Sequence, residues 1–196
     1  GNRILLSFGV LFVLMLVTAG VSYERLRAIN SEAVSIEHDS LPGVYLASSL
    51  RGAVNESFML LQQATFVETD PESVQRDLAK IAEAAKDIDS LSVEYQNSIF
   101  RDDDRQRFAT FRGTYDHYLP LLNEAVQRHR QSHDDAVAGY VKVQPAWAEV
   151  VRNANILVQE NRKFADQSAK LIRESVQDTE VVLATALAIM LLSALG

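Results

Sequence analysis

Arg51 is the side chain in this sequence best suited to binding chemistry. It lies between Ala47 and Val54, on a run of apolar residues spaced three and four apart. A guanidinium that is partly buried needs a partner, because an unpaired charge removed from water is costly. A carboxylate matches the planar guanidinium with two parallel hydrogen bonds. The position predicts a site for a small organic acid, and a structural salt bridge to Glu149 is the alternative.

Polar and aromatic residues at helical spacing accompany Arg51 as candidate ligand contacts. Tyr140, Gln144 and Trp147 recur on the predicted core stripe of a later helix, where Gln144 stands between two large aromatic residues. Such a mixture is typical of a pocket with hydrogen-bonding groups and an aromatic wall. Ordinary core packing or a solvated face is the alternative for each residue. The complete predicted site is Arg51, Asn55, Phe58, Tyr115, Tyr140, Gln144 and Trp147.

Other kinds of chemistry have little support in the sequence. The chain contains no cysteine, which excludes thiol catalysis, disulfides and cysteine zinc sites. It also contains no Gly-rich phosphate loop, nucleophile elbow or H-E-x-x-H motif. The formal charge of −7 argues against a nucleic-acid surface. The sequence therefore predicts a protein that is not an enzyme and that has no cofactor or metal.

Four amphipathic helices must position the candidate site. Apolar residues recur at three and four spacing in each, and no long stretch alternates with period two. The first helix is expected to run through Tyr23 to about Glu68, with a bend at Pro42 because proline removes one backbone bond. Asp70 and Pro71 are a cap and first residue for the second helix. Short connections between four such helices predict an all-α, antiparallel up-down-up-down four-helix bundle.

Both ends of the chain are uncharged and apolar. Ile4 to Val21 meets the length of about 18 residues that indicates a membrane span. Val181 to Gly196 is also uncharged, and we expect it to be the start of a second span. A cleaved signal peptide is the alternative for the first run. The predicted organisation is a transmembrane helix at 4–22, an extracytoplasmic bundle at 23–180, and a second transmembrane helix beginning at 181–196. The first and fourth helices of the bundle would continue into these spans.

Several short motifs fit one known family. The layout resembles the four-helix-bundle sensor domain of bacterial methyl-accepting chemotaxis receptors, the class that contains the aspartate and serine receptors. A span, a polar spacer, a Leu-Pro pair and a Leu-rich helix with an arginine are similar to that family's first helix, and a Gln-Pro pair is similar to one that borders the aspartate site. The matching segments are Gly20-Val21, Asn30 to Glu37, Asp39-Ser40-Leu41-Pro42, Leu46 to Arg51 and Gln144-Pro145.

The resemblance implies a multi-pass protein of the bacterial inner membrane with its sensor domain in the periplasm. It further implies a homodimer, a ligand site at the dimer interface, and cytoplasmic signalling partners reached through sequence beyond Gly196. Arg51 matches one arginine of the aspartate receptor, while Glu56 and Leu60 stand at later arginine positions and Ala146 replaces a threonine. Aspartate itself is therefore not the implied ligand.

The expected function is a chemoreceptor sensor that binds a carboxylate metabolite and signals by a shift of the fourth helix. Two alternatives remain open at the level of sequence. The same fold could serve a histidine kinase or a cyclase receptor, or it could be a ligand-free module that docks a periplasmic binding protein.

Overall fold

The computed structural model describes the backbone of residues 2–195, and the side chains of residue 9 and residues 11–191. All of its regular secondary structure over this range is helical. The chain divides into two compact units. The bundle unit comprises His38–Lys163, and the paired-helix unit comprises Gly1–Glu37 with Phe164–Gly196.

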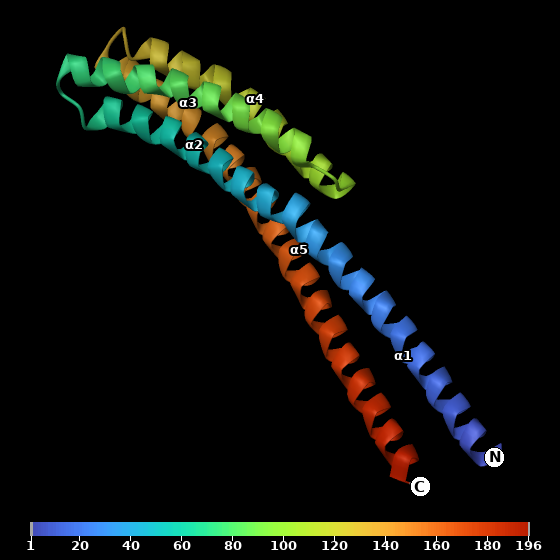
Figure 1. The fold of residues 1–196 in the computed structure, drawn as a ribbon. Helices are drawn as coiled ribbons and strands as arrows, with labels where there is room; N and C mark the ends of the chain where they lie inside the picture. The colour runs from blue at the N-terminus through green and yellow to red at the C-terminus, as the bar shows by residue number, and fades with distance from the viewer. Residues whose placement is uncertain (1, 196) are drawn as a thin grey trace. The chain divides into compact units, whose positions relative to one another are not determined.

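The bundle unit is the predicted antiparallel four-helix bundle. It contains α2 (Leu41–Phe66), α3 (Pro71–Ser98), α4 (Asp102–Arg128) and the first half of α5 (His133–Leu195). Figure 1 shows α2, α3 and α4 side by side with the early part of α5. The connections after α2, α3 and α4 are short, so neighbouring helices run in opposite directions. This confirms the all-α, up-down-up-down architecture.

The start of α3 follows from two adjacent residues. The Asp70 carboxylate accepts a hydrogen bond of 3.0 Å from the Ser73 backbone amide, which satisfies one of the free donors of the first helical turn. Pro71 occupies the first turn, where its missing amide proton costs nothing. At the same end of the bundle the His129 ring lies 2.9 Å from the Ala64 carbonyl, which joins the turn after α4 to the end of α2.

The expectation of one continuous first helix bent at Pro42 is wrong in detail. The chain forms α1 (Asn2–Ser35), then a π-helical turn η1 (Ile36–Ser40), and only then α2. Pro42 has no amide proton, so the carbonyl four residues earlier cannot receive its usual bond. A π-turn shifts the bonding pattern by one residue directly before the proline. The same turn buries Asp39 and Ser40.

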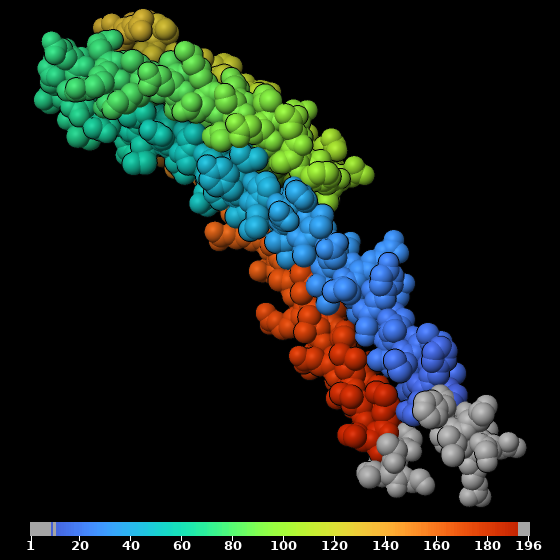
Figure 2. Space-filling view, in the orientation of Figure 1, coloured from blue at the N-terminus to red at the C-terminus, as the bar shows by residue number. Residues whose placement is uncertain are grey.

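The core of the bundle unit is a continuous apolar layer with an aromatic ladder on α4. Phe108, Phe111, Tyr115 and Tyr118 follow one another with ring centroids 6.0 to 6.3 Å apart, a range that offset aromatic pairs favour. Leu50, Val54 and Leu61 of α2 and Val143, Val150 and Leu157 of α5 are fully buried on the same layer. Figure 2 shows the side chains of α2 (cyan) and α3 (green) packed along the visible face.

The paired-helix unit joins α1 to the second half of α5. Arg25 and Asp178 form an ion pair of 3.1 Å between the two helices, and Ser168 and Ala186 are buried. The predicted spans at 4–22 and 181–196 both include residues whose side chains lie outside the described part. Among the described residues, no helix has a stretch both long enough and apolar enough to cross a membrane.

Two helical glycines predict opposite effects of the same substitution. A Cβ added at Gly139 would lie 2.9 Å from the Ala125 Cα, whereas one added at Gly113 would meet nothing within 4 Å. Gly113→Ala should raise the free energy of unfolding by about 0.5–1 kcal/mol, because alanine favours helix. Gly139→Ala should lower it by about 1–3 kcal/mol, because α4 and α5 must separate. Urea unfolding of both variants measures the contrast, and equal effects would refute this close approach.

Candidate functional site

Arg51 joins α2 to α5. Its guanidinium is half-buried, and its Nη1 donates a hydrogen bond of 3.0 Å to the side-chain oxygen of Asn155. The salt bridge to Glu149 considered from the sequence is not formed, and the Glu149 carboxylate lies 3.6 Å from Arg152. Arg51 thus has a neutral amide where a carboxylate would be the stronger partner.

The other half-buried arginines show what Arg51 lacks. Each of them lies within 4.0 Å of an aspartate or glutamate carboxylate, as an arginine withdrawn from water normally does. Among the described half-buried arginines, Arg51 alone has no such carboxylate. The four paired residues are Arg101 with Asp39, Arg107 with Asp103, Arg112 with Asp116, and Arg128 with Glu124.

Three predicted aromatic residues meet across α2 and α5. Phe58 stacks on Trp147 with ring centroids 4.2 Å apart and on Tyr140 at 5.1 Å. The indole Nε1 of Trp147 is buried and has no hydrogen-bond partner among the described residues. The structure therefore brings Phe58, Tyr140 and Trp147 together as a stacked group on the helix pair that also holds Arg51.

A groove of about 370 Å³ opens on α5 beside this group. Its lining is mixed, with apolar side chains interrupted by amide and guanidinium groups. Asn155 is shared, because it lines the groove and also accepts the bond from Arg51. The lining residues are Trp147, Ala148, Val151, Arg152, Asn155, Ile156 and Gln159.

The remaining predicted residues lie elsewhere or differ from expectation. Asn55 is half-buried on α2, one turn after Arg51. Tyr115 is fully buried on α4, where its ring stacks on Phe111 and packs at a tilt against Tyr118, so it belongs to the core and does not join the Arg51 group. The expected core position of Gln144 is wrong, because this residue is exposed.

The error at Gln144 is one of helical phase. Val143 and Ala146 occupy the buried positions on this stretch of α5. The spacing from Tyr140 to Gln144 is helical, but Tyr140 is itself only half-buried, at the margin of the core. A line of residues traced along α5 from Tyr140 to Gln144 therefore lies beside the face that the helix buries.

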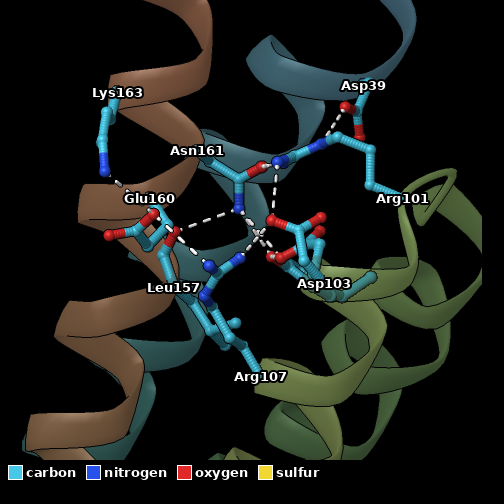
Figure 3. Close-up of polar contacts among 10 residues, drawn as sticks. Asp39, Arg101, Asp103, Arg107, Leu157, Glu160, Asn161 and Lys163 are labelled. Carbon is cyan, nitrogen blue, oxygen red and sulfur yellow. Dashed lines mark hydrogen bonds and ion pairs between the residues drawn. The ribbon is translucent and has the colours of Figure 1, made fainter.

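Sequence reasoning missed a second polar group at the end of the bundle that holds the α3–α4 turn. We call Asp39, Tyr95, Arg101, Asp104 and Asn161 the Asn161 cluster. Arg101 donates from Nε to Asp39 at 2.7 Å and from Nη2 to the Asn161 side-chain oxygen at 2.9 Å. Figure 3 shows Arg101 between Asp39 and Asn161.

The hydrogen bonds of the Asn161 cluster form a directed chain. The Asn161 amide donates to the Tyr95 hydroxyl at 2.7 Å and to the Leu157 carbonyl at 3.0 Å. The Tyr95 hydroxyl then donates to the Asp104 carboxylate at 2.9 Å. Buried polar groups arranged in this way are each satisfied by the next one in the chain.

Burial sets the ionisation of the Asn161 cluster. It raises the pKa of the Asp104 carboxyl above its usual value, and the nearby Asp39 charge adds to that rise, while the Tyr95 hydrogen bond and the Arg101 charge oppose it. Burial likewise raises the pKa of the Tyr95 hydroxyl, with a further contribution from Asp104. Two buried carboxyl groups thus share the surroundings of the Arg101 guanidinium.

The three consecutive aspartates of the first turn of α4, Asp102, Asp103 and Asp104, have different roles. None of them is the N-cap, which is Arg101, and Arg101 makes no side-chain cap bond. Asp103 pairs with Arg107, whereas Asp104 is only 2% exposed and enters the Asn161 cluster. Gly43 was the available signal, because glycine inside a helix often marks a close approach.

The bundle unit is thus an antiparallel four-helix bundle whose last helix, α5, continues beyond it, and Arg51 bonds to a residue that lines the groove on α5. The chain belongs to the family of four helix bundle sensory modules for signal transduction, which it matches over residues 1–176. The resemblance to the sensor domains of chemotaxis receptors is thereby confirmed. No curated protein matches the chain.

Proposed function

We propose that this chain is the periplasmic sensor domain of a chemoreceptor that binds a small organic acid between α2 and α5. Membership of a signal-transduction family supports the sensory role. The observation that carries the choice of ligand is Arg51, a half-buried guanidinium that is held by a neutral amide. A ligand carboxylate would replace the Asn155 oxygen and form a charge-assisted pair.

The neighbouring groups would complete recognition. The Asn155 amide, once released from Arg51, could donate to the bound acid from its side-chain nitrogen. Phe58, Tyr140 and Trp147 would form a rigid aromatic wall, since Tyr140 and Trp147 both stack on Phe58. The groove volume of about 370 Å³ suits a small metabolite. Asn55 and Gln144 would contribute additional hydrogen bonds to polar groups of the ligand. Tyr115 would not contact the ligand and would only support the packing of the core.

Signalling would follow from differential binding. Arg51 lies on α2 and Asn155 on α5, so a ligand that replaces their bond changes the free energy of one helix arrangement relative to another. The response would be a small shift of α5 that passes to the predicted second span at 181–196. We further propose that the receptor is a homodimer of the bacterial inner membrane, multi-pass, with cytoplasmic partners, no enzymatic activity and no cofactor.

A thermal-shift screen tests the ligand proposal. The full chain in lipid nanodiscs is melted with organic acids, amino acids and aromatic acids at high concentration. A true ligand at about 100 times its Kd should stabilise the fold by about 2.7 kcal/mol. Arg51→Ala should abolish this shift. Arg152→Ala is the matched control, because Arg152 lines the same groove but is exposed and paired with Glu149.

Two outcomes would reject the carboxylate site. A hit that survives Arg51→Ala places the ligand elsewhere. The absence of any hit across the panel favours the alternative in which a periplasmic binding protein, and not a free metabolite, is what the bundle detects.

A further inference from the structure

The Asn161 cluster connects α3, α4, α5 and the π-turn before α2 at one end of the bundle unit. Asp39 comes from the π-turn before α2, Tyr95 from α3, and Arg101 and Asp104 from the start of α4. Asn161 comes from α5 and is entirely buried among them. Figure 3 shows α5 (brown), η1 (blue) and the α3–α4 region (green) converging on this residue. None of the five residues belongs to the proposed ligand site.

Gly43 shows that this convergence is tightly fitted. A Cβ at residue 43 would lie 2.5 Å from the Asn161 side-chain oxygen, closer than atoms can approach. Glycine in a helix interior costs about 1 kcal/mol relative to alanine, so the sequence gives up helical stability at this position. The absence of a Cβ at residue 43 allows the Asn161 side-chain amide to lie directly against the α2 backbone.

The cluster also holds an unusual backbone. Asp39 lies within η1, is 6% exposed, and accepts the shortest bond from Arg101. The π-turn is therefore tied through Arg101 to Asn161 on α5. Single π-turns within helices occur frequently at functional sites.

We propose that the Asn161 cluster is a conformational latch that couples the position of α5 to the π-turn before α2. Four of its hydrogen bonds are 2.7 to 2.9 Å long, and a fifth, from Asn161 to Asp104, is 3.5 Å. A movement of α5 by one helical turn, about 5.4 Å, would take Asn161 out of bonding range of Arg101 and Tyr95. The latch is closed when these bonds are formed and open when they are broken. The proposal rests on the sensory family and is independent of which ligand binds at Arg51.

Coupling between α5 and the π-turn has a measurable consequence that a set of purely local structural contacts does not have. Perturbing either end of a coupled pair must change the other end by the same free energy. Asp39→Asn removes the charge on the π-turn side and keeps the side-chain size. Asn161→Leu removes the hydrogen bonds on the α5 side and keeps similar volume. Each substitution should therefore loosen the segment in which it does not lie.

Hydrogen exchange, measured by mass spectrometry on the full chain in nanodiscs, follows both segments at once. Asp39→Asn should accelerate exchange in residues 157–163 of α5 by about tenfold, the size expected for residues in one network. Asn161→Leu should accelerate exchange in residues 36–43 to a similar extent. The double variant should exchange no faster than the faster single variant, because one latch can be opened only once.

Arg107→Lys is the matched control. Arg107 lies at the same end and pairs with Glu160 and with Asp103, which also lies 3.5 Å from Arg101, but Arg107 itself has no bond to the π-turn. This variant should leave exchange in 36–43 unchanged. Gly43→Ala provides a second route should Asn161→Leu fail to fold, since it displaces Asn161 without deleting a polar group. If each substitution accelerates exchange only in its own segment, the cluster is a brace and the latch is refuted.

Discussion

Arg101→Ala should lower the free energy of unfolding by about 3–5 kcal/mol, because it leaves a buried carboxylate without its cation. Asp39 is 6% exposed and takes its 2.7 Å bond from Arg101. The same substitution removes the donor that satisfies the Asn161 oxygen. A loss of this size is a large part of the stability of a domain. Urea unfolding followed by circular dichroism measures it.

Two further variants test whether the loss of stability comes from the buried Arg101–Asp39 pair or from the loss of any arginine charge. Arg107→Ala removes a neighbouring arginine whose partner Asp103 is half exposed, and it should cost about 0–1 kcal/mol. Asp39→Ala in the Arg101→Ala background should recover part of the lost stability, because the unpaired charge is gone. If Arg101→Ala costs no more than Arg107→Ala, Asp39 finds solvent or another partner and the burial argument fails.

Acidification should stabilise the bundle through Asp104, which is the reverse of the usual behaviour of a carboxylate. Burial raises the pKa of Asp104 in the folded chain above its unfolded value of about 3.9. The folded state therefore binds this proton more tightly than the unfolded state does. The contribution of Asp104 to stability is gained as pH falls through the raised pKa, and is complete below the unfolded pKa.

Asp103, next to Asp104 in the sequence, should make stability depend on pH in the opposite direction. The hydrogen bond from Arg107 lowers the pKa of Asp103, so its contribution is present above the unfolded pKa and is lost as pH falls through the folded one. Unfolding free energies of the wild type, Asp104→Asn and Asp103→Asn are compared across a pH series. The excess stability of the wild type over Asp104→Asn should grow on acidification, and its excess over Asp103→Asn should shrink. A flat first difference would mean that Asp104 titrates normally.

Local signals were sufficient for most of the helices. The second helix was placed because Asp70 and Pro71 encode a cap and a first turn within a few residues, and the structure begins α3 at Pro71. The bundle followed from apolar spacing, which depends on which face each helix buries. The π-turn was not foreseen. Proline predicts a disturbance in the helix, but whether a bend or an extra residue absorbs it depends on packing around Asp39.

The site was harder because its decisive partners are distant in sequence. Arg51 was singled out by its place on an apolar stripe, but Asn155, 104 residues later, could not be identified from spacing within one helix. The Asn161 cluster has the same property, since Arg101 reaches residues about 60 positions away in both directions. Asparagine, arginine and aspartate are ordinary surface residues by type. Only the packing of four helices makes them buried neighbours.

The π-turn at Ile36–Ser40 has a bearing on how hybrid receptors should be built. Each residue of an α-helix advances the chain by about 100° around the axis, and a π-turn holds one residue more than the turn it replaces. Deleting a single residue between 36 and 40 should therefore restore an unbroken α-helical count and leave the angular phase of the earlier residues nearly unchanged. Deleting a residue from the α-helix on either side of the turn should instead rotate every earlier residue by about 100°. A fusion that joins a foreign membrane segment to this bundle can therefore omit one residue within the turn, but must preserve the number of residues in the helix that flanks it.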